Sequence, residues 1–226
     1  RELHVRRHSF PTRRSSDLFF ECEVENCQNF ILEGGSTETD GNGTLLVTSQ
    51  CLLTPTRNPH MNKEQIESYL CDTLGVGKVL WLDYGAFAGD DTDSHIDTLA
   101  RIAINDSIIY AGCDDENDEH YAELKKMEEQ LSTFKTIDDI PFKLYKLPFP
   151  NAIYDEDGER LPATYANYLI GNGVVWVPTY NQPENDEKAL QIIQSVFEGY
   201  DIVGIDCTAL IKQHGSLHCI TMQFPK

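Results

Sequence analysis

The chain is short of basic residues and of long apolar runs. It has 18 Lys and Arg against 37 Asp and Glu, which gives a formal net charge of −19. Such a charge argues against nucleic acid or an anionic membrane as a partner and favours a small cationic one. No apolar run approaches the roughly 20 residues that a membrane-spanning helix needs. We therefore expect a soluble chain.

Paired cysteine motifs are also lacking. The seven cysteines are an odd number, and no two of them have the CxxC spacing of a zinc site or a redox centre. Dispersed, unpaired cysteines are typical of a reducing compartment, and the sequence therefore predicts a cytoplasmic protein without a disulfide framework. They are Cys22, Cys27, Cys51, Cys71, Cys113, Cys207 and Cys219.

The first 18 residues differ from the rest. They are rich in Arg and have no apolar face or periodicity, and no apolar segment of the kind found in signal peptides follows the charges. The segment from His8 to Leu18 reads like the translation of a common sequencing adapter. We expect residues 1–18 to be a non-native, disordered leader that packs on nothing, and residues 19–226 to carry the fold.

Hydrophobic periodicity predicts a repeating order of hairpin, helix and strand. This order recurs about every sixty to seventy residues and favours an α/β ring of ββαβ modules over a doubly wound sheet. Asn62 and Asn185 are the expected caps of the first and last helices. The expected strands are 30–35, 44–48, 79–82, 98–104, 107–111, 142–147, 165–170, 174–177 and 201–205, and the expected helices are 63–74, 121–134 and 186–197.

The last cysteine lies beside a polar turn. Residues 217–224 alternate as a strand does, and Cys219 falls just inside this expected strand, after the turn at His214–Ser216. A free cysteine is most often a small buried hydrophobic residue. The local pattern therefore leaves open whether Cys219 is a core residue or an accessible thiol.

An acidic segment, Gly89 to Asp97, surrounds one histidine with four carboxylates. Strand-like alternation would place Asp91, Asp93, His95 and Asp97 on one side. The segment does not fit a calcium loop, because isoleucine stands at the sixth and twelfth positions, where glycine and glutamate are required. We expect no metal here, and a solvated acidic loop is the plain alternative to a functional site.

Three motifs together are more specific: Glu33-Gly-Gly, His95-x-Asp97 and Gly215-Ser-Leu-His-Cys219. With the segments 33–44, 51–59, 89–97, 161–167 and 203–206, they resemble the agmatine deiminase and bacterial peptidylarginine deiminase family. That resemblance implies the guanidino-group-modifying pentein fold, a five-bladed α/β propeller. About three of the five ββαβ modules would be present, with residues 19–226 forming the C-terminal part of the catalytic domain.

The resemblance also implies roles for five residues. Cys219 would be the nucleophile, His95 the general acid and base, and Glu33 the carboxylate that orients His95. Asp97 and Asp91 would bind the substrate. A guanidinium is a planar cation with a poorly electrophilic carbon, so carboxylates that hold it and a strong thiolate nucleophile suit the chemistry.

The implied reaction converts agmatine to N-carbamoylputrescine and ammonia through a covalent amidino-cysteine intermediate, as in putrescine biosynthesis. It needs no metal or organic cofactor. The expected partner is a small cationic guanidino compound, and a homodimer is compatible with the sequence. In the assembled site we expect Glu33 within roughly 2.6–3.2 Å of His95, with Asp97 and Cys219 facing one cavity.

The chain departs from the family pattern in three places. It lacks the Arg-Asp-x-Gly-Pro motif that carries a second guanidinium-binding aspartate upstream of Glu33. Ser94 and His214 also stand where glycine is common. Two alternatives therefore stay open beside agmatine deimination: deimination of peptidyl-arginine, and a catalytically inactive fragment.

Overall fold

A computed structural model describes Cys27 and residues 29–222 of the chain. The chain divides into two compact units, Arg1–Ile31 and Leu32–Lys226. The expected leader, residues 1–18, lies outside the described residues. All of the helices and strands given below belong to the second unit.

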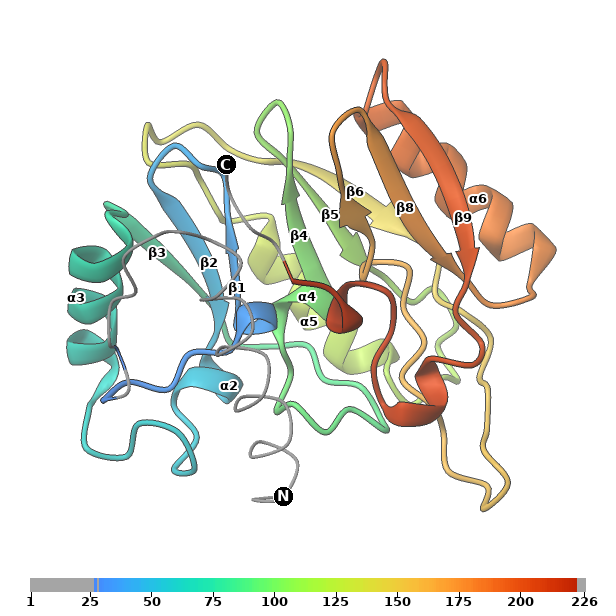
Figure 1. Cartoon of the computed structure of the whole chain (residues 1–226), viewed down its shortest axis with the longest axis horizontal. Helices are drawn as coiled ribbons and strands as arrows, with labels where there is room; N and C mark the ends of the chain where they lie inside the picture. Colours follow the sequence, from blue (N-terminus) through green and yellow to red (C-terminus); the bar gives the residue numbers. More distant parts are fainter. Residues whose placement is uncertain (1–26, 28, 223–226) are drawn as a thin grey trace, which may run out of the picture. The chain divides into compact units, whose positions relative to one another are not determined.

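Three sheets of one design make up this unit (Figure 1). In each sheet the first two strands are antiparallel, and the third pairs parallel to the second after a helical crossover. A parallel return needs such a crossover, because a tight turn can join only antiparallel strands. The predicted ββαβ module is therefore confirmed, in three copies.

The first sheet contains β1 (Thr37–Thr39), β2 (Thr44–Thr48) and β3 (Lys78–Leu82), with α3 (Lys63–Leu74) as its crossover. The second contains β4 (Ala100–Ala103), β5 (Ser107–Ala111), β6 (Lys143–Leu147) and the crossover α5 (Tyr121–Leu131). The third contains β7 (Leu169–Ile170), β8 (Val174–Thr179), β9 (Asp201–Asp206) and the crossover α6 (Pro183–Val196). The short helices α2 (Ser49–Leu52) and α4 (Ile96–Leu99) lie between these elements.

Local capping signals set several boundaries. Asn62 and Gln65 form a reciprocal capping box at the start of α3, and Gly75 ends that helix in the left-handed conformation (φ 69°), as predicted. The cap expected at Asn185 is wrong. Helix α6 begins at Pro183, whose fixed φ suits the first helical position, and the Asp186 carboxylate accepts the backbone N–H of Gln182.

Three expected strands near the start of modules differ from the structure. Of residues 165–170, only Leu169–Ile170 (β7) form a strand. Residues 30–35 do not form a strand: Glu33 is extended, and the 3-10 helix η1 (Gly34–Ser36) follows it, because the Ser36 backbone and hydroxyl both donate to the Glu33 carbonyl. Within residues 98–104, the helix α4 precedes the strand β4. The Thr98 hydroxyl and backbone N–H bond to the His95 carbonyl and close that helical turn.

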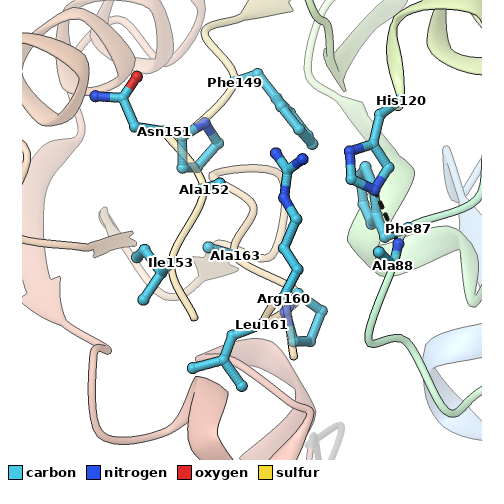
Figure 2. Close-up of a pocket in the computed structure, with 12 residues that line it drawn as sticks. Phe87, Ala88, His120, Phe149, Asn151, Ala152, Ile153, Arg160, Leu161 and Ala163 are labelled. Carbon is cyan, nitrogen blue, oxygen red and sulfur yellow. Dashed lines mark hydrogen bonds between the residues drawn. The ribbon is translucent and has the colours of Figure 1, made fainter. Parts of the chain in front are cut away.

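A small pocket is lined by Phe87, His120, Phe149 and Arg160 among others (Figure 2). The Arg160 guanidinium binds both oxygens of Asp118, at 2.7 and 3.1 Å, and lies over the Phe149 ring. The Ala88 N–H donates to Nε2 of His120, so Nδ1 carries the ring proton and donates to Asp118 at 2.8 Å. None of the predicted site residues lines this pocket.

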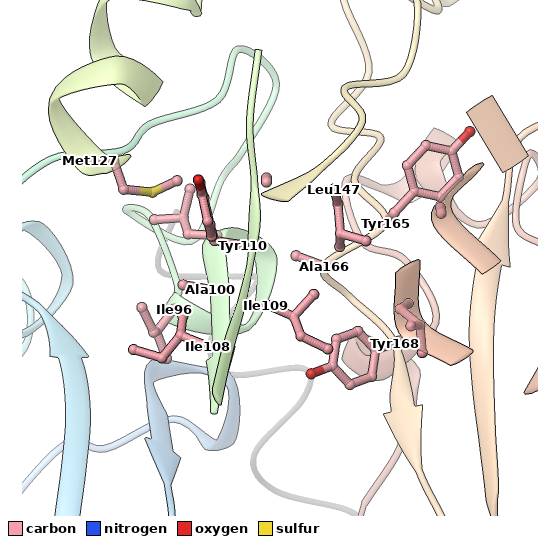
Figure 3. Packing of buried hydrophobic residues seen from close by; sticks show 14 of the residues in the cluster. Ile96, Ala100, Ile108, Ile109, Tyr110, Met127, Leu147, Tyr165, Ala166 and Tyr168 are labelled. Carbon is pink, nitrogen blue, oxygen red and sulfur yellow. The ribbon is translucent and has the colours of Figure 1, made fainter. Parts of the chain in front are cut away.

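The apolar core runs through all three modules. All five residues of β5 are buried, so this strand packs on both faces, as in parallel sheets covered on two sides. Figure 3 shows Ile108 next to Ile96 on one side of the strand and Ile109 next to Tyr168 on the other. Among the described residues, no helix combines the length and hydrophobicity of a membrane span.

The Asp118 network predicts an acid-sensitive contribution to stability. Burial alone would raise the pKa of Asp118, but hydrogen bonds from Arg160 and His120 lower it to about 2. Since its ordinary value is 3.8, the stabilisation is complete above about pH 4 and is lost as the pH falls through about 2. We expect Asp118→Asn to lower the free energy of unfolding by about 2 kcal/mol at pH 7.

Urea unfolding at pH 7 and at about pH 3 measures the difference in free energy of unfolding between the parent chain and Asp118→Asn. This difference should be smaller at the lower pH. Asp114→Asn is the matched control. Asp114 also pairs with a cation, Lys146, but its side chain is 72% exposed, against 16% for Asp118. If Asp118→Asn lowers the free energy of unfolding equally at both pH values, the prediction is contradicted.

Candidate functional site

Glu33 and His95 are 62 residues apart in sequence and in direct contact. Glu33 Oε2 lies 2.7 Å from His95 Nε2, so the expected hydrogen-bond distance is confirmed. Glu33 is the extended residue before η1, and His95 directly precedes α4, which contacts η1. Burial would raise the pKa of Glu33, but the hydrogen bond and charge of His95 and the charge of Arg57 lower it.

Arg57 ties Glu33 to the acidic segment. Its Nε donates to Glu33 Oε2 at 2.8 Å, its Nη1 to Asp93 Oδ2 at 2.9 Å and its Nη2 to the Thr92 carbonyl at 2.8 Å. Asp93 therefore faces Arg57 and does not share a face with Asp97 as strand alternation predicted. The family-like segment 51–59 contained Arg57, but its position in the sequence gave no sign of this role.

Cys51 is a third member of the Glu33–His95 group that sequence analysis missed. It is fully buried in α2, and its sulfur lies within 4.8 Å of ligand atoms of both Glu33 and His95. Burial alone would lower the pKa of His95. The interactions with Cys51 and Glu33, and the charge of Asp97, hold that pKa well above its usual range.

Asp97 is a buried carboxylate with an incomplete set of partners. The residue is 1% exposed and lies in the first turn of α4. Its Oδ2 accepts a hydrogen bond from His218 Nδ1 at 2.7 Å and lies 3.9 Å from Cys219 Sγ. Its Oδ1 is buried without a hydrogen-bond partner among the described residues. A buried carboxylate oxygen in this state is costly, so the geometry favours a donor that is supplied from outside the chain.

Cys219 lies in a 3-10 helix, so the strand predicted for residues 217–224 is wrong where it can be compared. Helix η3 spans His218–Ile220, and residues 223 and 224 lie outside the described part of the chain. The Asn167 Oδ1 accepts the backbone N–H groups of His218 and Cys219, at 2.8 and 3.4 Å. A side chain about fifty residues away in the sequence thus satisfies the donors that a strand would have used in a ladder.

The Cys219 sulfur points inward although the residue as a whole is exposed. It lies 3.5 Å from Asn167 Oδ1, and the backbone of Gly215 packs closely against the Cys219 side chain. Burial of the sulfur and the negative charge of Asp97 raise the pKa of the thiol to about 12. At neutral pH the thiol is therefore protonated, and a cation placed against Asp97 would favour the thiolate.

The two glycines after Glu33 behave differently. A Cβ on Gly35 would lie 2.8 Å from both Asp97 Oδ2 and His95 Nδ1, so a larger residue would displace these two side chains. A Cβ on Gly34 would meet nothing within 4 Å. The absence of a side chain at Gly35 therefore leaves room for both His95 and Asp97 beside its Cα.

The acidic segment is shaped by backbone conformation. Asp90 accepts hydrogen bonds from Thr92 and Ser94, and Ser94 has φ 63°. His214 has φ 60° and donates from Nδ1 to the Gly89 carbonyl at 2.8 Å. Left-handed backbone explains why the family pattern has glycine at both positions.

Asp91 is exposed, and its predicted contact with substrate stays a prediction.

A buried arginine joins the site to all three modules. Arg101 in β4 is ion-paired with Glu38 of β1, and its Nη1 donates to the Tyr168 carbonyl at 2.6 Å. Its Nη2 lies 3.4 Å from His218 Nε2. Because Arg101 can only donate, His218 Nε2 accepts, and Nδ1 carries the proton that binds Asp97. One chain of hydrogen bonds thus runs from Glu38 to the carboxylate next to Cys219.

The profile of the Porphyromonas-type peptidyl-arginine deiminase family matches residues 8–225. The chain belongs to this family. The match begins inside the segment 1–18, whose proposed non-native origin stays a prediction. The fold is accordingly the pentein fold, of which the described residues form three ββαβ modules.

Three relatives show how far the similarity extends. A protein of Yersinia pseudotuberculosis, provisionally named an agmatine deiminase, is 38% identical over 211 residues, or 86% of this chain and 57% of the relative. The structure of a provisional arginine deiminase from Porphyromonas gingivalis is 48% identical with a TM-score of 0.91, over 95% of this chain and 64% of that one.

The substrate-bound C315S agmatine deiminase of C. jejuni is 41% identical with a TM-score of 0.83, over 91% of this chain and 60% of that one. The chain thus spans about three fifths of the length of these relatives.

The raised thiol pKa predicts slow, strongly pH-dependent alkylation of Cys219. With a pKa of about 12, the reaction with neutral chloroacetamide should accelerate about tenfold per pH unit between about pH 7 and 10. Peptide mapping by mass spectrometry follows Cys219 separately from the other cysteines. Asp97→Asn removes the adjacent charge and should speed the reaction at a fixed pH near 8. A rate that does not change with pH, or that Asp97→Asn leaves unchanged, would contradict this account.

Proposed function

We propose that this chain carries the nucleophile and acid–base part of a deiminase site that hydrolyses a guanidino group. The preferred substrate is agmatine, which gives N-carbamoylputrescine and ammonia. The observation that carries the proposal is the buried Asp97 carboxylate, whose Oδ2 lies 3.9 Å from Cys219 Sγ and whose Oδ1 lacks a partner among the described residues. A buried carboxylate that has one oxygen without a partner among the described residues and that lies next to a thiol suits a flat cation that is attacked by sulfur.

In the proposed reaction, Asp97 holds the guanidinium through N–H donors. The bound cation offsets the negative charge that keeps the Cys219 thiol protonated, the thiol proton passes to solvent water, and the resulting thiolate attacks the guanidinium carbon. The C–N bond to one amino group breaks, and His95 supplies the proton with which ammonia leaves. The product of this half-reaction is the amidino-cysteine.

Water completes the reaction. His95 accepts a proton from a water molecule that attacks the amidino carbon, the C–S bond breaks, and the ureido product leaves with the thiol restored. Glu33, at 2.7 Å from His95, keeps the imidazole ring oriented and stabilises its protonated form. The elevated pKa of His95 suits the acid step. All of these steps use side chains and water alone.

Peptidyl-arginine is the second candidate substrate, because the matching family is described by that activity. The same guanidinium site would serve both substrates. Selectivity between agmatine and peptidyl-arginine therefore depends on groups farther from the reacting carbon. For either substrate, the excess of 37 acidic over 18 basic residues would attract a cationic partner and repel nucleic acid and anionic membranes. A cytoplasmic location and a homodimer remain parts of this proposal.

A matched pair of alkylating reagents tests the cation site. Chloroacetamidine is a small amidinium and chloroacetamide is its neutral counterpart. We expect the cationic reagent to label Cys219 roughly 10- to 100-fold faster, which corresponds to one charge-assisted contact of about 1.4–2.8 kcal/mol. Asp97→Asn should abolish most of this preference. Equal labelling rates in the parent chain, or a preference that survives Asp97→Asn, would show that Asp97 does not bind guanidinium next to Cys219.

Ammonia release tests the reaction itself. A full-length relative with the complete ring should release ammonia from agmatine, and the residues that correspond to Cys219 and His95 should be required. We expect substitution of the histidine by Gln to lower kcat by about 10²–10⁴. Preferred turnover of arginine-containing peptides would select the second substrate, and no turnover of either would reject the proposed reaction.

A further inference from the structure

Three side chains of different chemistry converge at the proposed catalytic histidine, which is one of them. Glu33, Cys51 and His95 each offer one ligand atom, and these atoms all lie within 4.8 Å of one another. A carboxylate oxygen, a thiolate sulfur and an imidazole nitrogen are the donors that zinc and related divalent transition metals prefer. We propose that these three residues form an inhibitory metal site for a zinc-class divalent cation.

The present geometry is close to that of a bound ion. Zinc lies about 2.0–2.3 Å from such ligands, so tetrahedral ligand atoms are roughly 3.3–3.8 Å apart. His95 Nε2 and Glu33 Oε2, at 2.7 Å, must separate slightly, and the Cys51 sulfur already lies within 4.8 Å of a ligand atom of each residue. These are side-chain shifts of about 1 Å, within the reach of small rotations about the χ angles.

Charge balance supports a divalent ion despite the neighbouring Arg57. One carboxylate and one thiolate together neutralise a +2 cation. Arg57 keeps two other partners, the Asp93 carboxylate at 2.9 Å and the Thr92 carbonyl at 2.8 Å. Arg57 and His95 both contact Oε2 of Glu33. Rotation of the Glu33 carboxylate can therefore present its other oxygen, Oε1, to the metal.

Burial sets the direction of entry. Cys51 is fully buried, while the side chains of His95 and Glu33 are 12% and 28% exposed. An ion that enters past Glu33 would reach the sulfur last, and Cys51 would close the inner end of the site. Three protein ligands leave a fourth position for water, as in open zinc sites.

The inhibition rests on the proposed function, whereas the binding of metal does not. A metal on His95 Nε2 removes the contact with Glu33 and occupies a nitrogen of the acid–base residue. Cys219 is outside this group, since its sulfur contacts Asp97 and Asn167. The bound metal would therefore stop proton transfer and leave the proposed nucleophile uncoordinated.

Cobalt(II) provides the direct test, because thiolate ligation to cobalt gives a charge-transfer band in the near ultraviolet and four-coordination gives strong visible bands. We expect the parent chain and Cys219→Ser to show the thiolate band with equal intensity. Cys51→Ser should lose it. Zinc competition against a chromogenic chelator should show affinity at least about tenfold lower for Cys51→Ser and His95→Gln, the loss of roughly one ligand.

Cys71→Ser is the matched control, since Cys71 lies in α3 and is not part of the group; its zinc affinity should equal that of the parent chain. Circular dichroism reports whether each variant folds. If Cys51→Ser does not fold, Glu33→Gln decides: it should keep the thiolate band but bind zinc more weakly. No band in the parent chain, a band that survives in folded Cys51→Ser, or a band lost in Cys219→Ser would overturn the proposed site.

Activity separates this proposal from the proposed function. In a full-length relative with the same three residues, zinc should inhibit ammonia release reversibly, and a chelator should restore it. Chloroacetamide should still label the nucleophilic cysteine at an unchanged rate when zinc is bound. Metal binding without any deiminase activity would reject the function and leave the site intact, whereas protection of the nucleophile by zinc would reject the site as proposed.

Discussion

The buried guanidinium of Arg101 is the interaction on which the rest of the structure depends. It pairs with Glu38 in the first module, donates to the Tyr168 carbonyl at the start of the third, and contacts His218 next to the nucleophile candidate. A charge that is 3% exposed is tolerable only when such partners replace water. Loss of one partner of a buried pair costs about 3–5 kcal/mol, so the three modules cannot separate here without a large penalty.

This arrangement explains why the site is organised before any substrate binds. Arg101 fixes the tautomer of His218, His218 fixes Asp97, and Asn167 fixes the backbone of Cys219. Each proposed reacting group is thus held by a neighbour from another part of the chain. Preorganised groups of this kind need little rearrangement during a reaction, and rearrangement is a main cost in catalysis.

Sequence reasoning succeeded where the signal was local. The Asn62 capping box, the glycine after α3 and the strands Thr44–Thr48 and Ser107–Ala111 follow from residues a few positions apart. The family-like motifs also named Glu33 and His95 as a contacting pair. The local features depend on short-range hydrogen bonds between residues that are close in sequence. The contacting pair was inferred from motifs that resemble those of a known family.

It failed where a distant side chain decides the local structure. The alternation in residues 217–224 predicts a strand, but Asn167, about fifty residues away, takes up the backbone donors and produces a 3-10 turn. Cys51 was passed over because nothing in its own segment indicates that it packs against His95. Pro183 outweighed Asn185 at the start of α6, and that signal was available in the sequence.

The separation of the site residues along the chain has a consequence for folding. Glu33 and His95 are 62 residues apart, and Asp97 is 122 residues from Cys219. Contacts of such long range form late, because closing large loops costs entropy that only assembled elements can offset. The contacts around Cys219 are therefore complete only when distant parts of the chain have come together, and the reactivity of a single thiol reports on the assembly of the whole unit.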